Sequence, residues 1–397
     1  MTNDIHIGIV GGGITGVSTA YFLAEKGFNP YIIEAGKLGK GDDDKISGSY
    51  PPPEPKHYLM ITTPYDSSLK LFLKENGNGK AEKYFELSNA GCYLMKSIAK
   101  EIDGNIVKEL GSLYVGSKRR KKNLEEELKG YREMGYGEDF VRFWSKEKIS
   151  ELYGTDKFYG GLFFPRDAIM DGRRYLIGML SKYKERINVV EDAELTSVEE
   201  IEDGVKIEIK YKDGKKENLT ADYVIFATNG FYKDRNLAGL VKMKWSFEIF
   251  FEDEGPDTPN TFIGVYPYYY FTRQNNILMI GGEDREVKNI RYSEDEKIAI
   301  DKLTEWARKK FSRLEKRNPA CVHFGIWART KDQIPIVGKF SEDSRSRIIY
   351  AVGCNGMVNP LVYGASLIPY MITRENMDEI QRDFADFLSP KRFKTND

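Results

Sequence analysis

A glycine-rich turn near the N-terminus has the residue types and the spacing that bind a pyrophosphate. It reads Gly11-x-Gly13-x-x-Gly16. The first glycine of such a turn permits a tight bend, the second lets the backbone approach phosphates, and the third allows a helix to pack closely on a strand. Glu34 follows 18 positions after Gly16, where a carboxylate can accept hydrogen bonds from ribose hydroxyls. These residues predict a dinucleotide site.

The elements around the turn are those that must position it. Residues 5–10 predict a buried strand, residues 17–26 a helix, and residues 29–33 a second strand that ends at Glu34. A phosphate would lie at the N-terminus of the helix, where backbone amides and the helix dipole favour negative charge. Because the second strand ends on an acidic residue, the pattern favours FAD or NAD over NADP.

Composition and charge exclude several other classes. The 397 residues include 60 basic and 61 acidic side chains, so no overall field attracts nucleic acid or an anionic membrane. The length predicts two domains, or one large core with an insertion. Three cysteines without a CxxC pair and three histidines predict neither a disulfide framework nor a metal site. We find no apolar run of the ~18 residues that a membrane span needs and no signal peptide, and we therefore expect a cytoplasmic protein.

The rest of the chain separates FAD from NAD. An NAD dehydrogenase of the lactate or malate type would continue with regular strand–helix repeats, and this chain does not. Residues 189–200 and 205–211 are rich in strand formers, and residues 222–230 form an apolar strand that ends in Ala-Thr-Asn-Gly. Further on come Ile280-Gly281-Gly282-Glu283 and a C-terminal section that contains Thr330-Lys331-Asp332-x-x-Pro335-x-Val337-Gly338 and Ala351-Val352-Gly353-Cys354-Asn355-Gly356.

Together with the glycine turn, these stretches resemble the D-amino-acid oxidase, glycine oxidase and sarcosine oxidase group of FAD-dependent oxidoreductases. The resemblance covers essentially the whole length. It implies an α/β fold in which a Rossmann-type FAD-binding domain is interleaved with an α+β substrate domain on a mixed sheet. The FAD-binding domain would comprise residues 1–60, 165–235 and 325–397, and the substrate domain residues 61–164 and 236–324.

The resemblance also implies which residues contact the cofactor. Sarcosine oxidases attach FAD to a cysteine at the position of Gly325, and Cys321 lies four residues earlier, so non-covalent FAD is expected. The residues expected to contact it are Gly11, Gly13, Ile14, Thr15, Gly16, Glu34, Ala35, Lys40, Gly41, Gly48, Ser49, Leu195, Ala227, Thr228, Asn229, Gly230, Gly353, Asn355, Gly356, Met357 and Val358.

In this family a small amine, such as an amino or imino acid, loses a hydride from its α-carbon to the flavin N5. The protein supplies a dry cavity, a substrate anchor and positive potential at the flavin O2 edge. That potential would come from the backbone amides of residues 356–358, before a helix that begins near Val362. The electron acceptor would be oxygen or a quinone or carrier. Met279 replaces the lysine that speeds the oxygen reaction in sarcosine oxidases, which leaves a dehydrogenase open.

The substrate anchor departs from the family pattern. Glycine and D-amino-acid oxidases have an arginine three residues before the threonine of the Thr-Lys-Asp motif, and here that position is Trp327. Sarcosine oxidases have an aromatic residue there, so Trp327 is expected to form part of the cavity wall. Arg329 would face the same side of a strand, as a carboxylate anchor or as a solvated charge. Tyr269 aligns with the family's substrate-facing tyrosine and Arg273 with a nearby arginine. His57, on a loop expected near the flavin, is more often a surface or packing residue.

Two alternatives stay open. The same fold could oxidise the C–OH bond of a 2-hydroxy acid or a similar alcohol, or the chain could be a flavin-binding subunit without turnover of its own. The three carboxylates of residues 42–44 are unfavourable beside a pyrophosphate, and we have no functional account of them.

Overall fold

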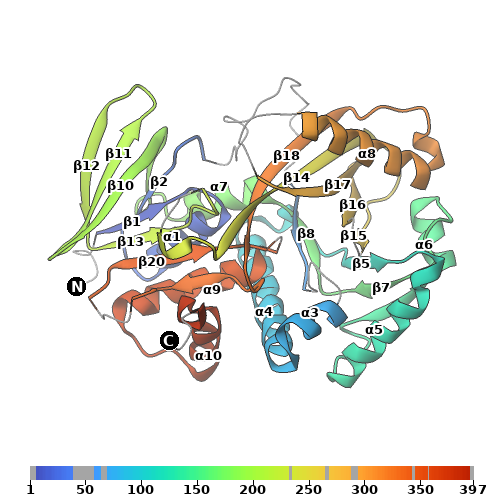
Figure 1. The fold of residues 1–397 in the computed structure, drawn as a ribbon, viewed down its shortest axis with the longest axis horizontal. Coiled ribbons are helices and arrows are strands. Elements are labelled where there is room, and N and C mark those ends of the chain that lie inside the picture. Colours follow the sequence, from blue (N-terminus) through green and yellow to red (C-terminus); the bar gives the residue numbers. More distant parts are fainter. Residues whose placement is uncertain are drawn as a thin grey trace.

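The computed structural model describes residues 6–38, 58–63, 69–231, 235–263, 268–287, 294–341, 345–355 and 357–393. Two sheet-based halves lie side by side, with the N-terminal and C-terminal elements together in one half (Figure 1). Each half combines segments that are far apart in the sequence. No helix among the described residues is long and apolar enough to cross a lipid bilayer.

The first half is built on a six-stranded sheet in the order β19-β20-β13-β1-β2-β9. All neighbouring strands are parallel except β19 and β20. The central strands are buried apolar runs, as expected where helices cover a parallel sheet. The strands are β1 (Ile7–Val10), β2 (Tyr31–Ile33), β9 (Asn188–Val190), β13 (Tyr223–Phe226), β19 (Ile336–Gly338) and β20 (Ile348–Val352).

Two smaller sheets flank this one. An antiparallel sheet of three strands lies at the outer end of the first half, formed by β10 (Ala193–Ile201), β11 (Gly204–Tyr211) and β12 (Lys216–Ala221) (Figure 1). A second three-stranded sheet consists of β3 (Tyr58–Ile61), β8 (Ala168–Asp171) and β4 (Val107–Lys108). Strand β8 follows β7 (Gly160–Phe164) of the second half in the chain and leads directly into α7 (Gly172–Lys182) of the first half, so this sheet lies where the chain passes between the two halves.

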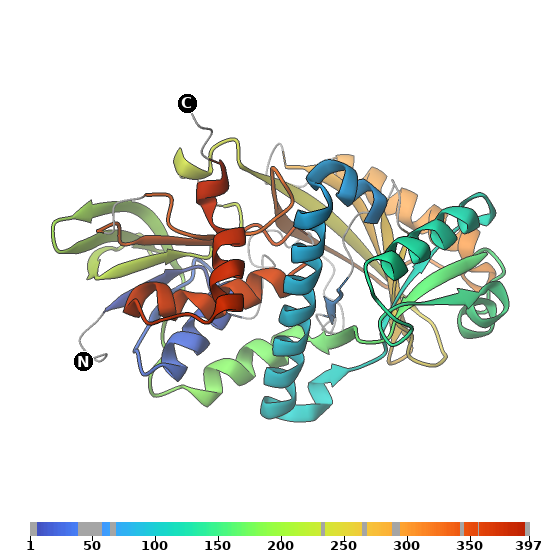
Figure 2. The same ribbon diagram turned by 90° about the horizontal axis from the view of Figure 1, so that it is seen from below.

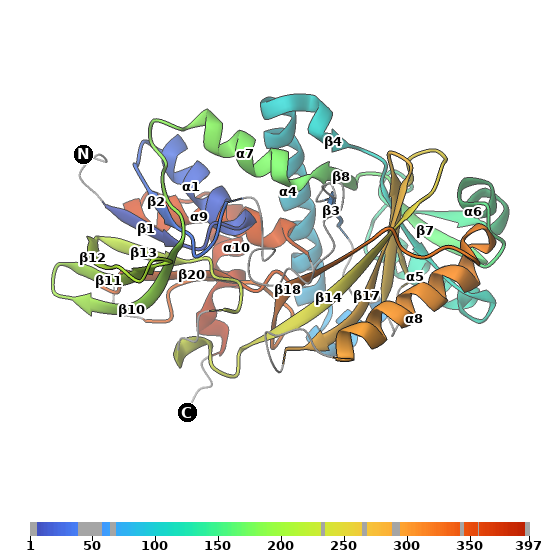
Figure 3. The ribbon, with the colours of Figure 1, turned by 90° about the horizontal axis from the view of Figure 1, so that it is seen from above.

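The second half is built on an eight-stranded sheet in the order β18-β14-β17-β16-β15-β5-β7-β6. Only β15 and β5 run parallel, so the sheet is mixed. Helix α8 (Glu294–Lys310) lies along the outer face of its β14–β17 part (Figure 3). The strands are β5 (Ser112–Val115), β6 (Arg142–Ser145), β7 (Gly160–Phe164), β14 (Val241–Glu252), β15 (Asn260–Ile263), β16 (Tyr269–Gln274), β17 (Ile277–Glu286) and β18 (Cys321–Thr330).

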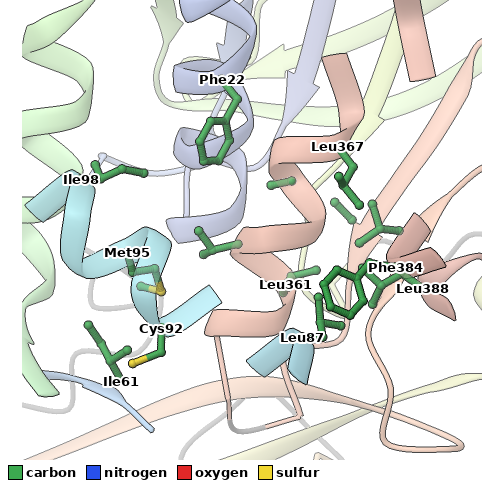
Figure 4. Close-up of a cluster of buried hydrophobic side chains, with 14 of the residues drawn as sticks. Phe22, Ile61, Leu87, Cys92, Met95, Ile98, Leu361, Leu367, Phe384 and Leu388 are labelled. Atoms are coloured by element: carbon green, nitrogen blue, oxygen red, sulfur yellow. The ribbon is translucent and has the colours of Figure 1, made fainter. Parts of the chain in front are cut away.

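Long helices form the core beside the parallel sheet. Helix α4 (Asn78–Asp103) runs between the two halves and packs against α9 (Asn359–Thr373), which also packs against α1 (Ile14–Glu25) (Figure 2). Phe22, Met95 and Leu367 come from these three helices and meet in one buried cluster (Figure 4). Each such side chain contributes about 1.5–3 kcal/mol by leaving water. The other helices are α3 (Leu69–Asn76), α5 (Lys121–Glu133), α6 (Lys146–Tyr153) and α10 (Glu379–Leu388).

The structure confirms the expected α/β fold class, with its parallel Rossmann-type sheet and its separate mixed sheet. The first helix begins at Ile14 rather than at residue 17, so it starts inside the glycine turn. The predicted helix near Val362 begins at Asn359, with a proline in its first turn. The residue boundaries expected for the two domains stay a prediction.

A buried carboxyl group holds the junction between the halves. Asp167 precedes β8, and its Oδ1 accepts hydrogen bonds from the backbone N–H (3.0 Å) and the hydroxyl (2.5 Å) of Thr63, which follows β3. Its Oδ2 accepts a hydrogen bond from the hydroxyl of Ser112 in β5. Burial raises the pKa of Asp167 to about 6, although these hydrogen bonds oppose the shift. The folded protein therefore binds a proton at this site more tightly than the unfolded chain.

We expect the stability of the wild-type protein to fall relative to Asp167→Asn as the pH rises from 4 to 6. An aspartate whose pKa is raised in the folded state stabilises the fold most while it is protonated. As the pH rises, its ionisation places a charge in the buried site, and that contribution to stability is lost. The interval between an ordinary pKa of about 3.9 and about 6 corresponds to roughly 3 kcal/mol. Urea unfolding of both proteins at pH 4.5 and pH 7 measures the change. Equal stability differences at the two pH values would contradict the assignment.

Candidate functional site

One cavity connects the glycine turn with the eight-stranded sheet. Its volume is about 510 Å³. At one end it is lined by the turn, the end of β2 and the start of β10, and at the other by β14, β17 and β18. The described lining residues at the sheet end are Glu248, Phe250, Met279, His323, Phe324, Gly325 and Ile326. The two halves of the molecule thus share a single site.

The glycine turn has the geometry that close packing demands. Gly11 has a φ of +105°, and a Cβ atom there would lie 2.5 Å from the carbonyl oxygen of Ala227. A Cβ atom on Gly16 would lie 1.8 Å from the carbonyl oxygen of Gly11. No side chain can fit at either position, because the obstacles are backbone atoms.

The N-terminus of α1 fits the phosphates of a dinucleotide. Gly13 is the N-cap residue, makes no side-chain cap, and has no heavy atom within 4 Å of where its Cβ would be. No acidic residue lies in the first turn of the helix. Gly13 and Ile14 line the cavity, so backbone amides of the first turn are available to an anion there.

The acidic end of β2 lies directly beside this turn. The carboxylate of Glu34 accepts hydrogen bonds from the backbone N–H groups of Gly12 and Gly36, each at 2.7 Å. Glu34 also lines the cavity, which suits the expected contact with a ribose. Of the other residues expected at the nucleotide, Ala35, Leu195, Ala227, Thr228 and Asn229 line the same end of the cavity.

Other residues expected at the cofactor have different positions in the structure. The described wall of the cavity does not include Thr15, Gly16 or Gly230. Thr15 and Gly16 lie in the first turn of α1, and a Cβ on Gly230 would face Met243. Gly353, Asn355, Met357 and Val358 are likewise absent from its described wall. Lys40, Gly41, Gly48, Ser49 and Gly356 lie outside the described residues, as do His57 and residues 42–44.

Asn355 organises the C-terminal motif. Its Oδ1 accepts hydrogen bonds from the backbone N–H (2.8 Å) and the hydroxyl (3.0 Å) of Thr330, and its Nδ2 donates to the carbonyl of Gly353. Its backbone N–H donates to the carbonyl of Ala328. The Thr-Lys-Asp segment is therefore bound to the loop before α9, and Asn355 has a structural role in this arrangement.

A row of polar side chains crosses the cavity face of the eight-stranded sheet. Tyr270 of β16 pairs with Gly281 of β17, Gly281 with Glu248 of β14, and Glu248 with His323 of β18. The hydroxyl of Tyr270 donates to Glu248 Oε1 at 3.1 Å, and His323 Nδ1 lies 3.1 Å from Glu248 Oε2. Glu248 is thus the centre of the row and lines the cavity with His323.

Gly281 makes this row possible. A Cβ atom there would lie 2.2 Å from Cζ of the Tyr270 ring, so the ring crosses the space that a side chain would fill. Burial, together with the carboxyl groups of Glu248 and Asp284, raises the pKa of Tyr270 well above its ordinary value. The phenol therefore keeps its proton and acts as a donor toward Glu248.

Two residues expected at the substrate lie on the opposite face of the sheet. Tyr269 packs against Trp306 of α8 at a ring-centroid distance of 5.0 Å, and its hydroxyl donates to Glu283. Arg273 is buried in an ion pair with Asp253 at 3.0 Å. Alternate residues of a strand point to opposite faces, and Tyr270, in register with Gly281 and Glu248, is therefore the tyrosine on the cavity side. Arg273 lies on the same face as Tyr269, away from the cavity.

Trp327 and Arg329 share a face of β18 with His323, but the structure places neither in the described wall of the cavity. The Nζ of Lys244 lies 5.7 Å from the ring centroid of Trp327. Burial raises the pKa of Asp284, and the nearby charges of Lys244 and Arg329 oppose that shift. Both side chains therefore belong to a polar cluster farther along the sheet.

Glu248 and His323 are the site residues that sequence reasoning missed. A signal for them was present, since Phe247 and Ile249 flank Glu248 and Val322 and Phe324 flank His323. This alternation predicts that each polar side chain lies on the face opposite its apolar neighbours. The pairing of the two strands, which joins residues 75 positions apart, is visible only in the structure.

Comparisons with solved structures show the same fold. Glycine oxidase from Geobacillus kaustophilus is 18% identical, with a TM-score of 0.77 over 99% of this chain and 100% of that one. L-proline dehydrogenase from P. horikoshii is 16% identical, with a TM-score of 0.70 over 99% of this chain and 98% of that one.

Sequence comparisons agree with this relationship. Gamma-glutamylputrescine oxidoreductase from Escherichia coli is 23% identical over 59% of this chain and 51% of that protein. The matches span about half or less of the length of the curated relatives. The family described as FAD dependent oxidoreductase (DAO) matches residues 6–361, and this chain therefore belongs to the DAO family of FAD-dependent oxidoreductases.

Proposed function

We propose that this chain binds FAD non-covalently and oxidises a small amine, such as an amino or imino acid. The observation that carries the proposal is the cavity that extends from the N-terminus of α1 to the side chains of β14, β17 and β18. A dinucleotide held at the first end would extend toward the second, where a substrate can enter.

The chain's own residues suit the two ends of such a ligand. At the nucleotide end, the first-turn amides of α1 would hold the pyrophosphate and Glu34 the ribose. At the sheet end, Phe250 and Met279 exclude water, and Glu248 and His323 offer polar contacts. FAD, when bound, supplies the acceptor for the hydride of the amine. Gly325, which stands where sarcosine oxidases attach FAD to a cysteine, lines the cavity and offers no side chain for a covalent bond.

Anaerobic reduction of the FAD-loaded protein tests the proposal. We expect an amine or an amino acid from a panel to bleach the oxidised-flavin absorbance, and 2-hydroxy acids to leave it unchanged. Bleaching by a hydroxy acid alone would favour the alcohol dehydrogenase alternative, and no bleaching by any compound would favour a flavin-binding subunit. Reoxidation by air or only by a quinone then identifies the class of electron acceptor.

Acid precipitation tests the mode of attachment. We expect all of the yellow colour to pass into the supernatant, because a non-covalent cofactor is released when the protein unfolds. Colour that stays with the precipitate would show a covalent bond and contradict this part of the proposal.

A further inference from the structure

We infer that Arg173, in the first turn of α7, binds the pyrophosphate of FAD and thereby helps to hold the cofactor. This inference rests on the proposed binding of FAD, and it names a residue outside the glycine turn that acts on the same group. It follows from the position of α7 beside α1 and from the charges that line the nucleotide end of the cavity.

Helices α1 and α7 lie side by side with a constant register (Figure 3). Ser18 Oγ lies 4.0 Å from the sulfur of Met179. One turn further on, the hydroxyl of Tyr21 accepts a hydrogen bond of 2.8 Å from Lys182 Nζ. The two residues of each pair are 161 positions apart in the chain, and an equal separation means that the two helices run in the same direction.

This register brings Arg173 to the level of the glycine turn. Arg173 follows Gly12 by the same 161 positions, so the two residues lie level with each other when the register is extended toward the helix N-termini. Both belong to the cavity wall, together with Gly13 and Ile14 at the start of α1. A guanidinium is not deprotonated in proteins, whatever its neighbours are. Arg173 therefore places a positive charge at the end of the cavity that would hold the phosphates.

Helix α7 contributes this side chain rather than its backbone amides. Asp171 is the N-cap residue of α7, and its Oδ1 accepts a hydrogen bond of 3.0 Å from the backbone N–H of Arg174. A carboxylate in this position satisfies one of the first amides and offsets the positive end of the helix dipole. Helix α1 has no side-chain cap, so its amides and the guanidinium of Arg173 can act on one anion between them.

The nucleotide end of the cavity needs a cation besides the N-terminus of α1. A pyrophosphate diester carries two negative charges, whereas the positive end of a helix dipole is equivalent to only about half an elementary charge. Glu34 and Glu194 line the same end, and their carboxylates would repel the phosphates. Without a cationic side chain, the charges of this end would disfavour the cofactor.

Two basic residues, Lys37 and Arg173, belong to the described wall of the cavity. Lys37 makes ion pairs with Glu191 at 3.0 Å and with Asp192 at 2.7 Å, and these two carboxylates compensate its charge. Arg173 is the one that the helix register places beside the turn. Its planar guanidinium can donate to two phosphate oxygens at once, which a lysine cannot do.

Flavin fluorescence titration of the full chain, freed of FAD, tests the inference in variants of α7. We expect Arg173→Met to bind FAD about 10- to 100-fold more weakly, as is typical for loss of a hydrogen bond to a charged group, and Arg173→Lys to lose less because it keeps the charge. Arg174→Met is the matched control, because Arg174 is the next residue of the helix, is exposed, pairs with Asp103 and lies outside the described wall. Wild-type FAD affinity in Arg173→Met would overturn the inference.

Adenosine and ADP separate phosphate binding from a disturbance of the whole site. Both contain the adenine and the ribose expected beside Glu34, and only ADP has a pyrophosphate. Competition against FAD gives both affinities. We expect Arg173→Met to weaken ADP binding by about 10- to 100-fold and to leave adenosine binding unchanged. An equal loss for the two compounds would show a structural effect of the substitution and would overturn the inference.

A substrate carboxylate is the other anion that Arg173 could bind, and 2-aminoisobutyrate probes this alternative. It has no hydrogen on the α-carbon and therefore cannot be oxidised. Calorimetry at saturating FAD compares its affinity for the wild type and for Arg173→Met, and we expect no difference. Full FAD affinity together with lost binding of 2-aminoisobutyrate would make Arg173 a substrate anchor and overturn the inference.

Failure of the inference and failure of the proposed function give different results. If the wild type and Arg173→Met bind FAD equally well, the proposed cofactor stands and the role of Arg173 is wrong. If the wild type takes up no FAD but binds ADP through Arg173, the proposed function is wrong and the assignment of Arg173 to a pyrophosphate stands.

Discussion

The Gly16→Ala variant is expected to lose FAD. The added Cβ would lie 1.8 Å from the carbonyl oxygen of Gly11, so α1 must move away from the turn that it packs against. Such a shift removes the alignment of the first-turn amides, and we expect FAD affinity to fall by at least about 100-fold, roughly 2.7 kcal/mol. Overpacking should also lower stability by about 1–3 kcal/mol. Fluorescence titration of the FAD-free protein measures the affinity.

Two further alanine variants separate cofactor binding from folding. Gly79→Ala in α4 meets no atom within 4 Å and should leave both FAD affinity and stability unchanged or slightly raise stability. Gly13→Ala also meets no atom within 4 Å, but its methyl group would enter the cavity at the expected pyrophosphate position. We therefore expect Gly13→Ala to fold normally and to bind FAD more weakly. Full FAD affinity in Gly16→Ala would contradict the assignment of this turn.

Arg273→Met is expected to destabilise the protein severely. Arg273 and Arg313 both bind the carboxylate of Asp253, at 3.0 Å and 2.5 Å, and only 2% of the Asp253 side chain is exposed. Burial raises the pKa of Asp253, but the two arginines lower it by more. The pKa of Asp253 therefore lies below its ordinary value. In this variant Arg313 still binds Asp253, but Asp253 loses one of its two cations, and the carbonyl oxygens of Pro256 and Leu152 lose their donor. We therefore expect a loss that approaches the roughly 3–5 kcal/mol of a broken buried ion pair.

Urea unfolding of the FAD-free protein measures this loss. Lys242→Met is the matched control, because its ion pair with Glu286 in the same sheet is exposed and should contribute only about 0–1 kcal/mol. A variant Arg273→Met that is as stable as the wild type but is no longer reduced by amines would restore Arg273 as a substrate-binding residue. Lower stability with unchanged FAD binding supports a structural role.

Local features of the fold could be predicted from the sequence because their physical cause is local. The glycine turn, the strand before it and the acidic end of the second strand lie within residues 5–34. Each is determined by backbone sterics and by the packing of one helix on two neighbouring strands. Met279, which the resemblance aligned with a lysine of sarcosine oxidases, lies in the cavity wall.

The face of the sheet on which a side chain lies could not be predicted where polar and apolar residues do not alternate along the strand. Residues 268–270 are three consecutive tyrosines, so either register gives the same pattern, and a shift of one residue moves every side chain to the other face. Tyr269 packs beneath α8, whereas Tyr270 crosses Gly281 to reach Glu248. Only the packing of α8 on one face of the sheet decides between the two tyrosines.

The sequence by itself determined that this chain has a dinucleotide turn in an α/β fold and that its C-terminal motif resembles one family of flavoproteins. The tertiary structure decided which charges meet. Arg273 pairs with Asp253 behind the sheet, and Glu248 pairs with His323 in front of it, on strands that are adjacent in space and 75 residues apart in the chain. The physical reason is that a local pattern depends on neighbouring backbone atoms, whereas a binding site depends on contacts between segments that only folding brings together.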